Sequence, residues 1–96
     1  MPQLLHLLYY DYGDDIVTRR APHREAHLAY LADWHADGRL LLGGAVGNPP
    51  DRGVLVFAIE DPAAVEAFAA QDPYVVNGLV TAWRVEPWTE VVAAGT

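Results

Sequence analysis

Four apolar runs of strand length divide the chain. Their high content of Val, Leu, Ile and aromatic residues is typical of β-strands, and clusters of Gly, Pro and Asp separate them. The segment "GNPPDRG" between the second and third runs is rich in turn-forming residues and predicts a hairpin-type loop. The predicted strands cover residues 4–10, 40–46, 54–60 and 79–85.

Two other segments have helical signatures. Residues 22–37 are rich in Ala and Leu, with a proline suited to the first turn and Gly38 suited to the C-terminal cap. Residues 61–71 begin with Asp61 as N-cap, again followed by proline. The order strand, helix, strand, strand, helix, strand predicts an α+β, ferredoxin-like βαββαβ subunit. In this fold both helices lie on one face of a four-stranded antiparallel sheet.

The predicted strands lack the polar alternation of a sheet with one solvated face. In the run 54–60, apolar residues occupy both the even and the odd positions up to Ile59, so both faces of the sheet favour burial. Each large side chain left in water forgoes roughly 1.5–3 kcal/mol. Two helices cover only one face, so the pattern predicts a homodimer with sheet against sheet around a two-fold axis and an apolar space between them.

The amino-acid composition limits which reactive groups the chain can use. The 96 residues predict a single domain, 1–96, and include no Cys, Ser or Lys. This excludes disulfides, zinc–thiolate and iron–sulfur sites, Ser or Cys nucleophiles and Schiff-base lysines. His, Asp, Glu, Tyr and Thr remain as reactive groups, and they favour proton transfer that requires no cofactor.

Charge and hydropathy bear on partners and location. The formal net charge of −7, with no basic patch, argues against nucleic acid and anionic membrane surfaces. The apolar run near the N-terminus is too short for a membrane span and has no basic residue before it, so we expect a cytoplasmic protein. A small molecule is the expected ligand.

His27 is the first candidate for chemistry. On a helical wheel, Arg24, Leu28, Leu31 and His35 form one stripe, and His27 lies with Trp34 at its edge. There it could reach a ligand while partly desolvated. The alternative is a boundary histidine bonded to the backbone. His23 lies four residues before His27, a spacing that metal sites use, but no third ligand is evident and we predict no metal site.

Asp72 is the second candidate. In "DPYVVNG" it is well placed to cap a short helical turn that begins at Pro73 and ends at Gly78. Arg24 could anchor an anionic substrate or form half of an ion pair. Tyr74 is the aromatic residue nearest to Asp72, and aromatic residues are by default part of the core or an interface.

Two blocks, "REAHLAYLADWHADGRLLLGG" (24–44) and "QDPYVVNGLV" (71–80), resemble the signature blocks of the YCII-related domain family, the YciI-like proteins. The resemblance extends from Leu4 to Trp88. Glu25 stands where the family often has proline, and Ala45 follows the two glycines where proline is usual. Both departures affect local loop geometry more than the site.

The resemblance implies a dimeric α/β barrel in which His27 and Asp72 pair as the active site. A carboxylate that accepts from one ring nitrogen raises the basicity of the other. The resemblance also implies elimination or dehalogenation of small hydroxylated aromatic compounds, as in a lyase or isomerase. Arg24, Tyr74, Gly43 and Gly44 are the expected substrate-binding residues. Cofactor-free oxygenation and a non-catalytic dimeric module that binds a metabolite or assists another enzyme are the alternatives.

Overall fold

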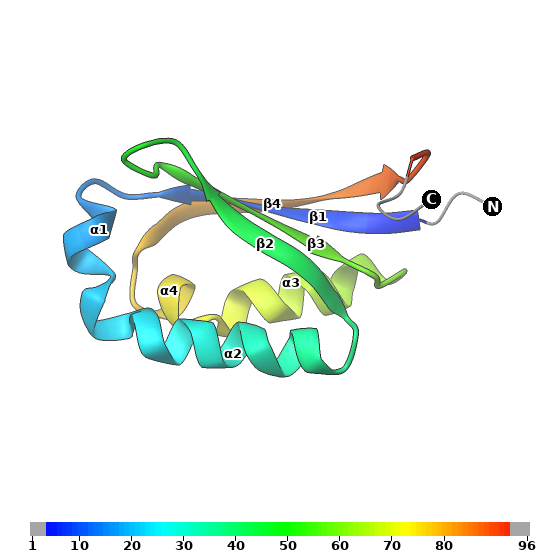
Figure 1. Ribbon diagram of the computed structural model, residues 1–96, viewed down its shortest axis with the longest axis horizontal. Helices are drawn as coiled ribbons and strands as arrows, with labels where there is room; N and C mark the ends of the chain where they lie inside the picture. Colours follow the sequence, from blue (N-terminus) through cyan, green and yellow to red (C-terminus); the bar gives the residue numbers. More distant parts are fainter. Residues whose placement is uncertain (1–3, 93–96) are drawn as a thin grey trace.

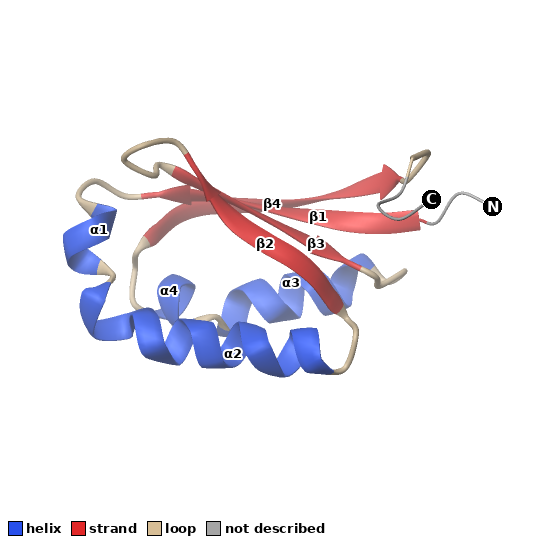
Figure 2. Ribbon diagram, in the orientation of Figure 1, coloured by secondary structure: helices blue, strands red, loops and turns tan. Residues whose placement is uncertain are grey.

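A computed structural model describes residues 4–92. Its sheet has the strand order β2-β3-β1-β4 with every pair antiparallel, and the helices lie together on one face (Figures 1 and 2). This confirms the predicted α+β, ferredoxin-like fold. The elements in chain order are β1 (Leu4–Tyr12), α1 (Ile16–Arg19), the 3₁₀ helix η1 (Ala21–His23), α2 (Arg24–Ala36), β2 (Leu40–Val46), β3 (Arg52–Phe57), α3 (Pro62–Gln71), α4 (Pro73–Val76) and β4 (Val80–Thr89).

The predicted elements differ from the observed ones mainly at their ends. Strand β1 continues to Tyr12, β3 ends at Phe57, and β4 continues to Thr89 through Pro87. Proline is tolerated there because β4 is an edge strand, where one side of the backbone needs no partner. The sequence did not predict α1, because four residues with only Ile16 buried carry no helical periodicity.

The helix ends follow the predicted capping chemistry. The Asp61 carboxylate accepts a hydrogen bond from the Ala63 N–H at 2.9 Å at the start of α3. Gly38 after α2 and Gly78 after α4 have φ of 83° and 75°, a left-handed conformation that glycine adopts without strain. With these ends, α2 and α4 lie on the same face of the sheet, and α4 packs beside α2.

The face of α2 that packs on the sheet differs from the predicted stripe. His27 is buried and Trp34 is half-buried, whereas Leu28 is 47% exposed. The prediction that His27 lies at the edge of the packed face is therefore wrong. The reason is that aromatic side chains extend much further than Leu28 can. Trp34 packs against Phe68 of α3, with the ring centroids 4.9 Å apart, and this contact sets the rotation of the helix.

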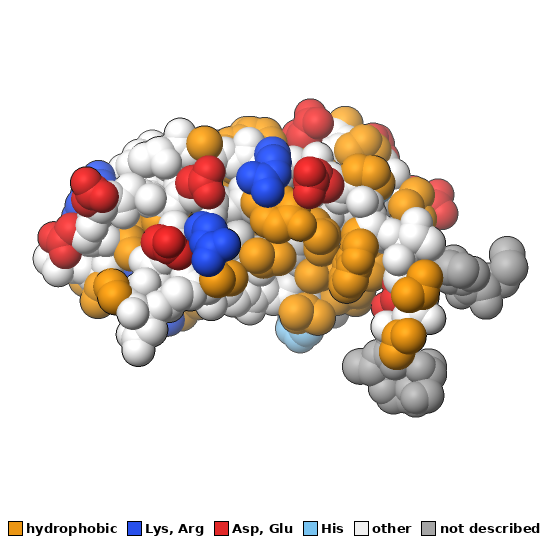
Figure 3. Space-filling model, turned by 90° about the horizontal axis from the view of Figure 1, so that it is seen from above, with side chains coloured by type: hydrophobic (Ala, Val, Ile, Leu, Met, Phe, Trp, Pro, Cys, Tyr) orange, Lys and Arg blue, Asp and Glu red, His pale blue; other side chains and the backbone are white. Residues whose placement is uncertain are grey.

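The other face of the sheet carries no helix in the described part of the chain (Figure 1). Strand register places Leu42, Val56 and Leu7 in one row across this face. Figure 3, which views this face, shows hydrophobic side chains gathered at its centre with charged ones around them. Leu42 is 64% exposed and Trp88 46% exposed. The pattern that predicted two apolar faces is therefore realised in the structure.

Candidate functional site

Asp72 lies at the junction of α3 and α4. It ends the first helix and caps the second, and its Oδ1 accepts the Tyr74 N–H at 2.9 Å. Pro73 occupies the first position of α4, where its missing N–H has no consequence. The Asp72 side chain is completely buried. The predicted cap is therefore present, and its carboxylate is held in a fixed orientation inside the protein.

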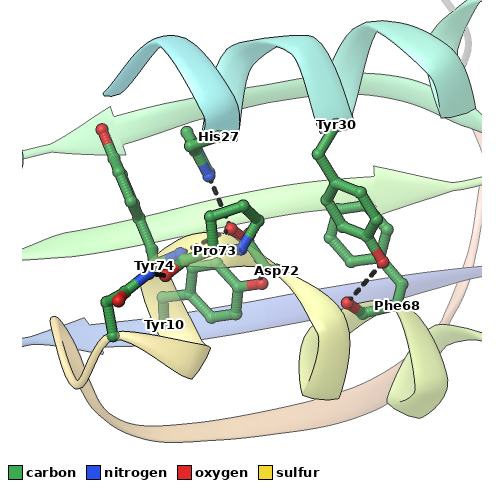
Figure 4. A network of polar contacts seen from close by, with 8 residues as sticks. Tyr10, His27, Tyr30, Phe68, Asp72, Pro73 and Tyr74 are labelled. Carbon is green, nitrogen blue, oxygen red and sulfur yellow. Dashed lines mark hydrogen bonds and ion pairs between the residues drawn. The ribbon is translucent and has the colours of Figure 1, made fainter. Parts of the chain in front are cut away.

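Two side chains complete the environment of this carboxylate (Figure 4). His27 Nδ1 lies 2.7 Å from Asp72 Oδ1, and the Tyr10 hydroxyl donates to Oδ2 at 2.8 Å. If the carboxylate is ionised it can only accept, and His27 Nδ1 is then the donor, which leaves the lone pair of a neutral imidazole on Nε2. Nε2 has no hydrogen-bond partner within residues 4–92 and is not among their fully buried unpaired atoms. It therefore remains accessible to a ligand.

The Tyr74 ring fixes the plane of the imidazole. The rings of His27 and Tyr74 are stacked, with centroids 3.6 Å apart and an interplanar angle of 5°. Asp72 thus positions the histidine twice, directly through Nδ1 and indirectly by capping the helix that carries Tyr74. The Tyr74 hydroxyl itself is buried and has no hydrogen-bond partner among residues 4–92.

A cavity of about 190 Å³ opens beside this pair. Its volume equals about six water molecules, at roughly 30 Å³ each, and suits a single-ring ligand. All four predicted binding residues line it together with His27, and Asp72 lies behind the histidine. The lining residues are Tyr12, Arg20, Arg24, His27, Leu28, Leu31, Gly43, Gly44, Ala45, Leu55 and Tyr74.

The two predicted glycines contribute differently to the cavity wall. A Cβ at Gly43 would lie 3.3 Å from Leu55 Cγ, a close contact that would push on the wall. A Cβ at Gly44 would meet nothing within 4 Å in the described chain. A side chain at position 43 would therefore require Leu55 to shift by a few tenths of an ångström, whereas Gly44 contributes backbone only.

Sequence reasoning missed Tyr12 and Arg20. The available signals were spacing alone: Tyr12 lies two residues after Tyr10 and so on the same face of β1, and Arg20 lies four residues before Arg24. To predict Arg20 as a cavity residue, one would have needed to know α1 and η1, which bring Arg20 back toward the sheet.

The cavity is electrostatically unusual for an acidic protein. Burial raises the pKa of Tyr12 to about 12, with further increases from Tyr74 and Asp72, while Arg20 and Arg24 act in the opposite direction. Burial, and then the Asp72 carboxylate, also raise the pKa of Tyr10 far above its usual value. Both phenols are therefore neutral hydrogen-bond donors at physiological pH.

Arg24 does not form the ion pair that was one of its two predicted roles. Neither Arg24 nor Arg20 lies within 4.0 Å of an acidic group in the described chain. By contrast, Arg39 is paired with Asp37 at 2.7 Å. The arginines beside the cavity are thus free to meet a ligand.

Comparison with known proteins identifies the family of this chain. The model of the YCII-related domain matches residues 4–89. The chain belongs to this family. Protein YciI of Escherichia coli O6:H1 is 31% identical over 97 residues, covering 92% of this chain and 99% of its own length. An uncharacterised protein from Haemophilus influenzae is 33% identical over 97 residues, covering 88% of this chain and 99% of its own length.

A solved structure is similar over most of the chain. It is the 5-chloro-2-hydroxyhydroquinone dehydrochlorinase TftG from Burkholderia phenoliruptrix AC1100, in complex with 2,5-dihydroxybenzoquinone. The TM-score is 0.74 and the identity 27%, covering 88% of this chain and 92% of that one. Protein NE2512 of unknown function from Nitrosomonas europaea, with a TM-score of 0.58 and 17% identity, shares the fold over 97% of this chain and 93% of its own.

Residues 4–92 contain neither a cluster of metal ligands nor a helix suited to crossing a membrane. No group of three His, Cys, Asp or Glu side chains is arranged to hold a metal ion there. His27, half of the His23–His27 pair, bonds to Asp72 instead. None of the helices in this range has the length and apolar character needed to cross a membrane.

Proposed function

We propose that this YCII-family protein is an enzyme that moves a proton on a small hydroxylated aromatic substrate, without a cofactor. His27 is the general base and Asp72 orients it. The observation that carries the proposal is the Asp72 carboxylate, which accepts three hydrogen bonds at 2.7–2.9 Å, one of them from His27 Nδ1. That arrangement leaves Nε2 as the acceptor beside the cavity.

The proposed chemistry begins with a hydroxyl group of the substrate. Neutral His27 Nε2 accepts its proton, and the resulting electron pair moves into the ring. In an elimination, the ring carbon that bears the leaving group takes up this proton, a second hydroxyl then loses its own proton to become a carbonyl, and chloride leaves with the C–Cl electron pair, so the net loss is HCl. In an isomerisation, the reaction ends when the proton has been returned to a ring carbon. The Asp72 carboxylate stabilises the imidazolium that forms between the two steps. No oxidant is consumed in either case.

The substrate class rests on the cavity and on the neighbour. A volume of about 190 Å³ accommodates one ring. Tyr74 and the Gly43–Gly44 backbone form part of the wall, and Arg24 anchors an anionic group. The structurally similar TftG is a dehydrochlorinase of a chlorinated hydroxyhydroquinone, so the corresponding reaction is the first to test on this chain.

We also infer that the protein is a homodimer. The helix-free face exposes Leu42 and Trp88, and the row across β2, β3 and β1 is formed by Leu42, Val56 and Leu7. A second copy packed sheet to sheet would remove these side chains from water. Since Gly44 lies on β2 beside both the cavity and this face, the partner would lie close to the site.

Chloride release from 5-chloro-2-hydroxyhydroquinone tests the proposed function. We expect the wild type to release chloride and His27→Ala to lower kcat/KM by about 10² to 10⁴, the range for a general base. His23→Ala, one helical turn away and outside the cavity lining, serves as the control and should retain activity. Wild-type activity in His27→Ala would exclude His27 as the base.

The second candidate is a non-catalytic binding module. The half-open cavity with free arginines would serve this function equally well. A module would be stabilised against heat by 2,5-dihydroxybenzoquinone and would release no chloride from 5-chloro-2-hydroxyhydroquinone. Release of chloride from that compound would favour the enzyme.

A further inference from the structure

Arg20 and Arg24 lie one helical turn apart on the same side of the chain. Arg20 follows α1, and η1 continues the winding into α2, which begins with Arg24. Both side chains line the cavity. Like charges four residues apart destabilise a helix, and no acidic side chain within 4.0 Å in residues 4–92 compensates either of them. An anion between them would reverse this repulsion.

Two phenols face the same cavity. The rings of Tyr12 and Tyr74 meet edge to face, with centroids 6.4 Å apart. The Tyr12 hydroxyl fits only because position 53 is glycine: a Cβ on Gly53 would lie 2.6 Å from its oxygen. The buried Tyr74 hydroxyl has no partner in the described chain, and such an unpaired group normally destabilises a protein.

The cavity therefore offers donors and no competing anion. Its lining contains two guanidinium groups, two phenols and His27, but no Asp or Glu. In a chain of formal net charge −7, a pocket lined in this way is exceptional. Guanidinium groups bind planar oxyanions through paired, charge-assisted hydrogen bonds.

We propose that Arg20, together with Arg24 and the Tyr12 hydroxyl, forms an oxyanion-binding subsite that selects an already ionised single-ring substrate over its neutral analogue. This inference rests on the proposed function for the position of the reacting group at His27. It adds Arg20 and Tyr12 as specificity-determining residues. It also means that the substrate enters with one ionised oxygen, and His27 acts on a second hydroxyl.

The test is a binding titration of the full-length protein with two probes. Each hydroxyl of 2,5-dihydroxybenzoquinone is conjugated to a ring carbonyl, which makes it as acidic as a carboxylic acid and ionised at neutral pH. Hydroquinone is also a single six-membered carbon ring with two oxygens para to each other, and it is neutral at this pH. We expect Arg20→Gln and Arg24→Gln each to weaken the binding of the quinone about tenfold or more, and to leave hydroquinone binding unchanged.

Arg19→Gln is the matched control. It removes the same charge from the neighbouring residue, which is exposed and does not line the cavity, and should leave quinone binding unchanged. Tyr12→Phe keeps the ring at the cavity wall and removes its hydroxyl. It should weaken the binding of the quinone and leave the binding of hydroquinone unchanged. Thermal melting of each variant checks that the fold is retained.

The outcomes separate this inference from the proposed function. Failure of the wild type to bind the quinone, or equal binding by the wild type and both cavity arginine variants, would overturn the subsite. If these variants lose affinity while His27→Ala retains full turnover, the subsite stands and the proposed base is wrong. If Arg19→Gln lost as much affinity for the quinone as Arg20→Gln, the weaker binding would be due to the change in net charge alone. That result would also overturn the subsite.

Discussion

Asp72 combines a structural and a chemical role in one side chain. Its Oδ1 caps α4 and also faces His27 Nδ1, while Oδ2 accepts from Tyr10. A carboxylate can do this because its two oxygens offer about four acceptor positions. Capping and catalysis are therefore compatible at one residue, and a capping motif in a sequence does not argue against an active site.

The pairing of these residues could be predicted from sequence only through the family resemblance. Spacing alone left His27 as a boundary residue and Asp72 as a cap, because a contact across 45 positions leaves no local signal. Tyr10 was missed as the third partner of the carboxylate for the same reason. The stacking of Tyr74 on His27 depends on side-chain rotamers, which no pattern of residue types specifies.

Alkaline pH should destabilise the protein through its buried tyrosines. The pKa of Tyr12 rises from 10.0 to about 12 on folding, and burial raises that of Tyr30 to about 12 as well. Between these values the unfolded chain has lost protons that the folded chain retains, so stability is complete below pH 10 and falls as pH rises toward 12. The slope is at most about 1.4 kcal/mol per pH unit for each tyrosine.

Urea unfolding at pH 8 to 12 measures this effect. Tyr12→Phe removes one titrating group and should make the decline in the free energy of unfolding less steep above pH 10. A decline of equal slope in the variant and the wild type would show that Tyr12 ionises equally readily in both states.

At the scale of elements, α2, α3 and α4 were predictable because capping residues marked their ends. The rotation of α2 was not, because Trp34 and Phe68 pack across the helix pair and override the stripe of smaller residues. Helix α1 escaped prediction, yet it brings Arg20 to the cavity. The fold could thus be predicted from the hydrophobic and capping patterns, whereas the cavity wall at Arg20 depends on the irregular segment formed by α1 and η1.

The two aspartate caps provide a comparison within the same chain. Asp61 and Asp72 each accept one backbone N–H at 2.9 Å, but only Asp72 is buried and has side-chain partners. Asp61→Ala should lower the free energy of unfolding by about 0.5–2 kcal/mol. Asp72→Ala should lower it by several kcal/mol, since each buried donor left unpaired costs roughly 1–3 kcal/mol more.

Urea denaturation of both variants measures the difference. Equal losses of stability would mean that the bonds from His27 and Tyr10 contribute nothing beyond the cap. Such a result would weaken the argument that the carboxylate holds the histidine in place.

At the scale of the whole molecule, the apolar character of both sheet faces remains the strongest argument for a dimer. We expect light scattering at micromolar concentration to give twice the mass of one chain. Leu42→Glu should shift the mass toward the monomer without unfolding it, because this side chain is already 64% exposed in the single chain. Thr81→Glu, on the exposed part of edge strand β4, provides a charge-matched control.

A wild type that remains monomeric in this experiment would contradict the dimer. It would leave the proposed chemistry intact, since His27, Asp72 and the arginines of the cavity all belong to one chain. The cavity would then be open on the side of β2.

The proposed mechanism requires Asp72 to hold the Nδ1–H of His27 and to leave Nε2 free to accept a proton. Long-range ¹H–¹⁵N NMR of the ring-labelled protein, at a pH where the imidazole is neutral, reports directly which nitrogen is protonated. We predict Nδ1–H for His27 in the wild type, with a mixture of tautomers in Asp72→Asn. Finding the proton on Nε2 in the wild type would contradict the account, because the nitrogen facing the cavity could then not act as the base.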